Sequence, residues 1–118
     1  MISVTETMSK PADFVQGTLD VLLLKILTLE PMHGWAISER LKQVSGGVLQ
    51  VSEGSLYPAL HKLEQEGWIT AKWQSAEKNR RAKFYSLTPL GRKVLARESA
   101  HWERLSSAIS QVLRLNEV

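Results

Sequence analysis

The sequence predicts a small, mainly helical α+β domain in which three helices precede a two-stranded β-hairpin and one long helix follows it. Three patterns support this fold class: apolar stripes at helical spacing in the first half, two short strand-like runs around a basic turn, and a long amphipathic segment near the C-terminus. A length of 118 residues suits one domain with an extension, and a hydrophobic content of 43% is enough for a packed core.

The composition limits the kinds of protein this chain can be. It contains no cysteine, which excludes a disulfide scaffold and a thiolate metal site and makes a reducing cytoplasm the simplest location. No stretch approaches the ~18–20 apolar residues of a membrane span. The first seven residues also lack the basic and apolar regions of a signal peptide. We therefore expect a cytoplasmic protein with no membrane partner.

The chain divides into three parts. Residues 1–14 have no hydrophobic periodicity and are expected to form a flexible arm, residues 15–88 a compact domain, and residues 89–118 a C-terminal helix. The first helix is expected from Thr18 to Leu29, with Thr18 as its N-cap and Pro31 as its stop. Its apolar residues are so frequent that most of its sides should be buried.

The second helix is expected from Gly34 to Val44, after a turn over residues 30–34. Ile37, Leu41 and Val44 would share its core face, and Gly46-Gly47 would end it. A short extended link over residues 48–51 follows.

The third helix begins at Ser52 or Ser55, since either serine can act as its N-cap. With Ser55 as the cap, Pro58 would lie in the first turn, where a missing N–H costs nothing. The core stripe is Leu56, Leu60 and Leu63, and Gly67 ends the helix. The opposite, solvent-facing side holds Gly54, Pro58, His61, Lys62 and Gln65, with Tyr57 at its edge.

A β-hairpin follows the third helix directly. Its strands are expected at Trp68–Gln74 and Ala82–Leu87. The intervening segment has no Asn-Gly pair and no glycine, so we expect a longer loop over Ser75–Arg81 rather than a two-residue turn. The tip is strongly basic, with no acidic residue among Lys78, Asn79, Arg80, Arg81, Ala82 and Lys83.

The last helix is expected to begin after Thr88, with Pro89 as its first residue, and to reach about Leu115. Its far end carries Trp102, Leu105, Ile109 and Val112, spaced 3, 4 and 3 residues apart as in a coiled coil. The rest of the chain is too short to cover this stripe, so a second copy is the expected cover. The sequence thus predicts a homodimer.

The charge is unevenly distributed. Residues 1–66 carry five Lys/Arg and eight Asp/Glu, a net charge of −3, whereas residues 67–118 carry ten Lys/Arg and four Asp/Glu, a net charge of +6. An amphipathic helix beside a cationic loop is the geometry of a winged helix-turn-helix, in which one helix enters the DNA major groove. The alternative is an ordinary solvated surface, but the helix and hairpin together favour double-stranded DNA as the partner.

Candidate DNA contacts follow from this arrangement. On the third helix they are Ser55, Tyr57, His61 and Lys62, with Pro58 on the same side, because hydroxyl, ring and cationic groups recognise phosphates and base edges. On the hairpin they are Lys78, Asn79, Arg80, Arg81 and Lys83, which could lie over the sugar–phosphate backbone or reach into the minor groove.

Other candidate sites are weaker. Trp102 is more readily explained as a packing anchor than as a flat wall for an aromatic effector. Trp35, Trp68 and Trp73 are expected in or at the edge of the core. The three histidines, His33, His61 and His101, lack metal-ligand spacing, so no metal site or cofactor is expected. Glu53-Gly54-Ser55 has no base placed near it by the sequence, so an enzyme is not expected.

Several motifs together resemble the PadR family of bacterial transcriptional regulators. They are Gly17-Thr18-Leu19-Asp20, Pro31-Met32-His33-Gly34-Trp35, Gly54-Ser55-Leu56-Tyr57-Pro58-Ala59-Leu60, Leu63-Glu64-Gln65-Glu66-Gly67-Trp68-Ile69 and Asn79-Arg80-Arg81-Ala82-Lys83-Phe84-Tyr85-Ser86-Leu87-Thr88. The short tail is similar to a compact subgroup with a single C-terminal helix.

The resemblance implies a homodimeric repressor that binds palindromic operators and is relieved by a small aromatic effector. It adds Ser52 to the expected DNA contacts and marks Trp102 as an effector-binding candidate. We thus expect a dimer that presents two helices to half-sites ~34 Å apart. Two alternatives remain at this stage: a winged-helix protein-interaction module, and a small-molecule-binding dimer without DNA regulation.

Overall fold

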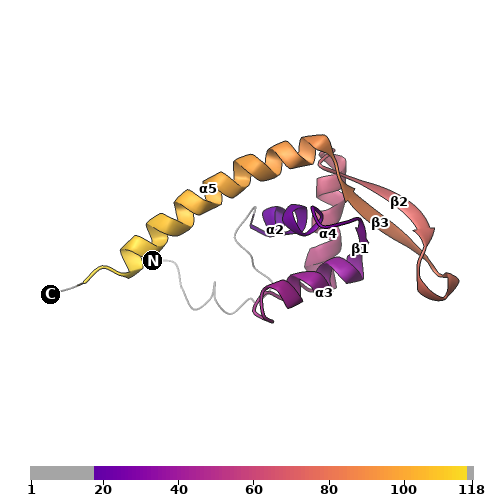
Figure 1. The fold of residues 1–118 in the computed structure, drawn as a ribbon, viewed down its shortest axis with the longest axis horizontal. Helices are drawn as coiled ribbons and strands as arrows, with labels where there is room; N and C mark the ends of the chain where they lie inside the picture. The colour runs from indigo at the N-terminus through magenta and orange to yellow at the C-terminus, as the bar shows by residue number, and fades with distance from the viewer. Residues whose placement is uncertain (1–17, 117–118) are drawn as a thin grey trace.

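The computed structural model describes residues 18–116 of the chain (Figure 1). The elements in chain order are α2 (Thr18–Ile26), β1 (Met32–His33), α3 (Gly34–Val44), α4 (Glu53–Gln65), β2 (Ile69–Ser75), the 3-10 turn η1 (Glu77–Asn79), β3 (Arg81–Leu87) and α5 (Pro89–Leu113). The predicted mainly helical winged-helix fold is confirmed. The arm expected over residues 1–14 lies outside the described residues.

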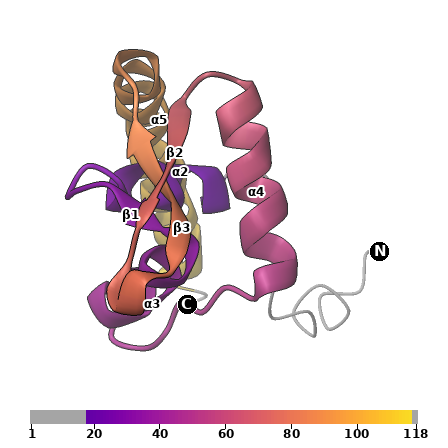
Figure 2. The same cartoon turned by 90° about the vertical axis from the view of Figure 1, so that its right-hand side faces the viewer.

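The sheet has three antiparallel strands in the order β1-β3-β2, which corrects the prediction of a two-stranded hairpin. Strand β1 pairs Met32 with Tyr85 and His33 with Phe84. Strands β2 and β3 pair in register from Ile69 opposite Leu87 to Ser75 opposite Arg81. A two-residue strand has no alternating pattern to reveal it. In Figure 1 β3 lies between β1 and β2, and Figure 2 shows α4 to one side of the sheet.

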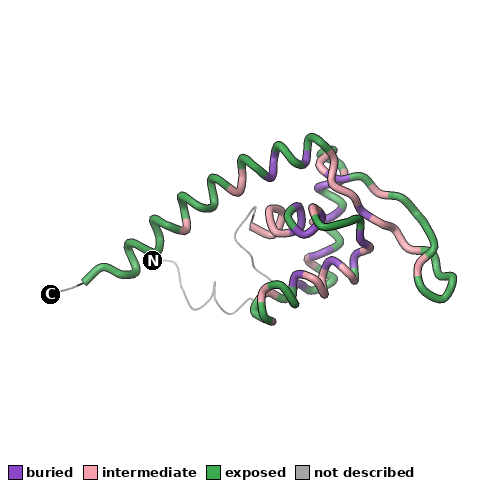
Figure 3. The backbone as a smooth tube through the Cα atoms, viewed as in Figure 1, coloured by how far each residue is buried: buried purple, intermediate pink, exposed green. Residues whose placement is uncertain are grey.

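The core lies where α2, α3, α4, the sheet and the start of α5 meet (Figure 3). Its fully buried side chains are mostly leucines, as the stripes predicted: Leu23, Leu24, Ile37, Leu56, Leu60, Leu63 and Ile69. Helix α4 therefore presents one face to the core and the other to solvent. Val44 is a correction, because it is exposed although its spacing from Leu41 predicted a core position.

The start of α4 is settled by a hydrogen bond. The Ser52 side chain accepts a hydrogen bond from the Ser55 amide at 3.3 Å, so Ser52 is the N-cap of α4. Pro58 consequently lies inside the helix rather than in its first turn, and it leaves the Gly54 carbonyl without the usual amide donor. Gly67, with φ of 79°, follows the end of α4 as expected.

Helix α2 is shorter than predicted. It ends at Ile26, and the Leu29 amide donates to the Ile26 carbonyl at 3.1 Å in a tighter turn. The expected stop, Pro31, lies five residues beyond that end. Because Thr18 is the first described residue, its role as an N-cap stays a prediction.

Helix α5 is locked to the domain at its N-terminal end. The Thr88 hydroxyl donates to the Gly67 carbonyl at 2.7 Å and accepts from the Gly91 amide at 3.0 Å, which confirms the predicted cap. A Cβ atom at Gly91 would lie 2.0 Å from the Trp68 carbonyl oxygen, so only glycine allows this approach. The helix ends at Leu113 after 25 residues, and Figure 1 shows it extending well beyond the rest of the fold.

Candidate nucleic-acid interface

The exposed face of α4 is the first part of the candidate interface. Burial of Leu56, Leu60 and Leu63 on one side fixes the helix orientation. The side chains predicted to contact DNA lie on the other side: Tyr57, Pro58, His61 and Lys62 are exposed, and Ser55 is half-buried. Ser52 and Ser55 both take part in the N-cap, where the two hydroxyls lie 3.3 Å apart. The sequence therefore predicted the sidedness of this helix correctly.

Tyr57 is held by a close approach to the start of α3. A Cβ atom at Gly34 would lie 2.6 Å from the Tyr57 hydroxyl oxygen and 2.7 Å from its Cε1. The tyrosine ring thus occupies the space that a side chain at position 34 would fill. Packing against Gly34 places the hydroxyl between α3 and α4 while nearly half of the residue stays exposed.

Two of the predicted cationic contacts are engaged in ion pairs. Lys62 Nζ lies 2.8 Å from Asp20 Oδ2 on α2, and Lys83 Nζ lies 3.1 Å from Glu64 Oε1 on α4. Lys83 also stands 5.6 Å from the centre of the Tyr85 ring. These pairs tie α4 to α2 on one side and to β3 on the other. Sequence spacing could not reveal them, because Asp20 and Lys62 are 42 residues apart.

The second part is the wing, defined here as β2, the loop 76–80 and β3. Its tip turns through Lys78 and Asn79, both with φ near 60°, a left-handed conformation that asparagine tolerates better than lysine. Lys78, Asn79, Arg80 and Arg81 are exposed. Within residues 18–116, none of the cations Lys78, Arg80 and Arg81 forms a salt bridge. The prediction of a longer loop, rather than a two-residue turn, is confirmed.

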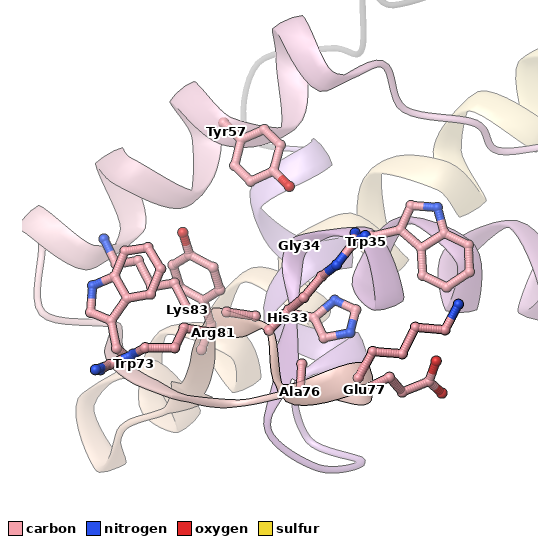
Figure 4. A pocket seen from close by; sticks show the side chains of 13 residues that line it. His33, Gly34, Trp35, Tyr57, Trp73, Ala76, Glu77, Arg81 and Lys83 are labelled. Carbon is pink, nitrogen blue, oxygen red and sulfur yellow. The ribbon is translucent and has the colours of Figure 1, made fainter.

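A groove of about 740 Å³ lies between the wing on one side and, on the other, the junction of β1 with α3 and Tyr57 of α4 (Figure 4). It is lined by the rings of His33, Trp35, Tyr57, Trp73 and Tyr85, by the charged residues Glu77, Lys78, Arg80, Arg81 and Lys83, and by Gly34, Ala76 and Ala82. In the view of Figure 4, Trp73 and Trp35 stand on opposite sides with Tyr57 between them. The lining thus combines flat rings with an excess of positive charge.

The two tryptophans at this groove were missed by sequence reasoning. Trp35 and Trp73 were expected in the core or at its edge, but they are 66% and 57% exposed, so that prediction is wrong. Trp68 does pack against the core as predicted. An apolar ring in a strand or at a helix start looks the same in sequence whichever side it faces. Only the chain path shows that these two rings face the groove.

His33 organises one end of the groove. Its Nδ1 accepts a hydrogen bond from the Ala36 amide at 3.2 Å and so caps α3. Its ring stacks on the Trp35 ring with the two centroids 6.4 Å apart. It also packs edge-to-face with the Phe84 ring, with the two centroids 5.3 Å apart. Burial raises the pKa of the neighbouring Tyr85 phenol, and Lys83 partly opposes that rise. Tyr85 therefore stays neutral over the physiological range.

The far half of α5 carries an exposed apolar stripe, which we call the α5 stripe. Its members Trp102, Leu105, Ile109 and Val112 are 39% to 70% exposed. In contrast, Val94 and Leu95 near the start of the helix are buried. The stripe thus extends past the domain and meets no cover within residues 18–116.

No group of three or more His, Asp or Glu side chains in residues 18–116 is placed to hold a metal ion. None of the helices described here is both long and apolar enough to cross a membrane.

Comparison with known proteins gives a consistent result. A family profile described as "Transcriptional regulator PadR-like family" matches residues 23–97. The chain is 31% identical over 97 residues to the transcriptional regulator Rv3488 of Mycobacterium tuberculosis, covering 82% of this chain and 87% of that protein. Two crystal structures are also similar.

The first is a PadR-like transcriptional regulator from Bacillus cereus, with 26% identity, a TM-score of 0.74, and coverage of 86% of this chain and 97% of that one. The second is a PadR family transcriptional regulator from Eggerthella lenta, with 29% identity, a TM-score of 0.72, and coverage of 86% of each chain.

Proposed function

Because the chain belongs to the PadR-like family of transcriptional regulators, we propose that it binds specific double-stranded DNA as a homodimer and represses transcription. Helix α4 would enter the major groove, and the wing would lie over the adjacent backbone or reach into the neighbouring minor groove. Action on DNA would place the protein in the cytoplasm. The expected operator is palindromic, because a two-fold symmetric dimer presents the same helix twice.

The observation that carries this proposal is an exposed polar face on α4 next to a loop whose cations have no ion-pair partner among the described residues. Tyr57 and His61 project from α4 into solvent, and Arg80 and Arg81 stand at the tip of the neighbouring wing. Phosphate contacts from the wing would supply affinity, whereas groups on α4 would supply sequence preference. A protein-interaction module would not need this concentration of free positive charge.

The homodimer part of the proposal rests on the α5 stripe. Trp102, Leu105 and Ile109 repeat at coiled-coil spacing and remain exposed in a single chain. Pairing with the same stripe of a second copy would bury them, and it would set the separation of the two α4 helices. Trp102 is the effector-binding candidate, because its indole could form one wall of a site for a planar aromatic molecule at the dimer interface.

The proposal is tested by fluorescence anisotropy with DNA from upstream of the protein's own gene and a scrambled duplex of equal composition. We expect tighter binding to the upstream duplex, with log affinity falling linearly against log salt concentration. Absence of binding to either duplex at low salt would overturn DNA binding and favour the interaction module. Sedimentation of the free protein tests the dimer separately.

A further inference from the structure

The groove between α4 and the wing is the part of this surface with no assigned partner. Its aromatic rings Trp35, Trp73 and Tyr57 are all exposed, although apolar rings are usually buried where a fold allows it. We propose that this groove seats the sugar–phosphate strand that separates the major groove of DNA from its neighbouring minor groove, with Trp35 as a DNA-contacting residue. The inference rests on the proposed function and adds a site to it.

The geometry of DNA leads to this occupant. A helix in the major groove and a wing at the adjacent minor groove are separated by one sugar–phosphate backbone. In this protein a groove lies between Tyr57 of α4 and the wing, and its lining includes the buried Tyr85 and the half-buried Ala82. Any duplex that touched both α4 and the wing tip would have to pass that backbone across the groove.

The chemistry of the lining matches a backbone strand. Arg80, Arg81 and Lys78 supply three positive charges against the single carboxylate of Glu77, and Lys83 is already paired with Glu64. Cations of this kind bind phosphate oxygens, while flat rings cover the apolar faces of the sugars. A small aromatic anion would also be attracted, but it would not need cations and rings spread over helix, strand and loop.

Trp35 is held ready for such a contact. Its ring stacks on His33, which is itself fixed by the cap of α3 and by Phe84 of β3. A braced ring loses little conformational freedom on binding, so its contact contributes more of its gross energy to affinity. Trp73 faces the groove from β2, but it belongs to the wing and would respond to any wing contact. Trp35 lies on α3 and is therefore the decisive residue.

The test uses the full chain labelled with 5-fluorotryptophan and observed by fluorine NMR. Its four tryptophan resonances are assigned by replacing each tryptophan with phenylalanine in turn. A mixed-sequence duplex is titrated at low salt, where backbone contacts dominate. We expect the Trp35 and Trp73 resonances to shift as DNA saturates the protein, while Trp68, packed against the core, and Trp102, on the far half of α5, serve as internal references.

A second measurement separates a neutral contact from a charged one. Trp35→Ala should weaken binding about threefold to tenfold, as expected for the loss of a ring contact of ~0.6–1.4 kcal/mol. The slope of log affinity against log salt should stay unchanged, because the indole neutralises no phosphate. A folded Trp35→Ala protein with undiminished affinity would overturn the inference.

The outcomes remain distinct from failure of DNA binding itself. If anisotropy shows a bound duplex but the Trp35 resonance does not move, the strand seat is wrong while the proposed function stands. If Trp35 responds to benzoate and not to the duplex, the groove is a small-molecule site instead. If no duplex binds at all, both the proposed function and this inference fall.

Discussion

The α4 face and the wing both carry cations, but these cations are held differently. Lys62 on α4 lies 2.8 Å from Asp20, and Lys83 near the start of β3 lies 3.1 Å from Glu64. Lys78, Arg80 and Arg81 at the tip have no such partner within residues 18–116. Charge near α4 is thus used inside the protein to hold the helix, whereas charge at the tip remains available to an outside anion. Net charge alone would not distinguish the two.

The largest effect on stability is expected from a substitution where α4 packs on the core, because the α4 face and the wing both depend on that packing. Leu60→Ala removes a fully buried side chain and should lower the free energy of unfolding by about 2–5 kcal/mol. Urea denaturation followed by circular dichroism measures the change. Val48→Ala, at an exposed loop position, is the control and should change stability by less than about 0.5 kcal/mol. Equal effects of the two substitutions would contradict the buried placement of Leu60.

The second-largest effect is expected from removing the two arginine charges at the wing tip. The double variant Arg80→Ala/Arg81→Ala should lose about 3 kcal/mol of binding, on the basis of about 1.5 kcal/mol for each charged hydrogen bond. The loss should be alike for operator and scrambled DNA, and the salt slope should fall by about two units. Anisotropy over a salt series measures both quantities. A loss confined to one sequence would mean that the tip contributes to sequence preference instead.

A substitution on the α4 face should change sequence preference rather than affinity for all DNA. His61→Ala is expected to reduce the preference for the operator over the scrambled duplex by about 1–3 kcal/mol, with binding to the scrambled duplex nearly unchanged. Competition between the two duplexes in one anisotropy experiment gives the difference directly. Uniform weakening on both duplexes would assign His61 to the backbone and remove the contrast between helix and wing.

How far the sequence could predict this arrangement depends on the range of the interactions involved. Local signals were reliable: the leucine stripe of α4, the end of that helix at Gly67, and the Thr88-Pro89 start of α5 all appear as expected. These features depend on residues within one or two turns. The choice between Ser52 and Ser55 as the cap was left open, because both satisfy the same local rule.

The predictions that failed share another cause, because they depend on contacts between residues far apart in the chain. Strand β1 exists only because Met32 and His33 meet β3 about 50 residues later in the chain. Trp35 and Trp73 were expected near the core, but the path of the chain turns them toward the groove. The ion pairs of Lys62 and Lys83 were missed for the same reason, since their partners come from other elements. Sequence reasoning thus found the surfaces of the candidate site but not the groove between them or the way α4 is held.

The smallest effect is expected from the substitution that tests most directly how the Lys62 ion pair holds α4. Asp20→Asn removes the partner of Lys62 and should lower stability by less than about 1 kcal/mol, because the lysine side chain is nearly half exposed. The freed ammonium group could then reach a phosphate, which would steepen the salt slope by about one unit. Anisotropy over a salt series measures the slope.

The double variant Asp20→Asn/Lys62→Gln is the matched control, since it removes the charge that Asp20→Asn releases. Its salt slope should return to the wild-type value, because we expect the ion pair with Asp20 to keep Lys62 away from phosphate in the wild-type protein. A wild-type slope in Asp20→Asn, together with a reduced slope in the double variant, would show that Lys62 contacts phosphate despite its pairing. In that case α4 would share the role assigned to the wing, and the difference between the two regions would be one of degree.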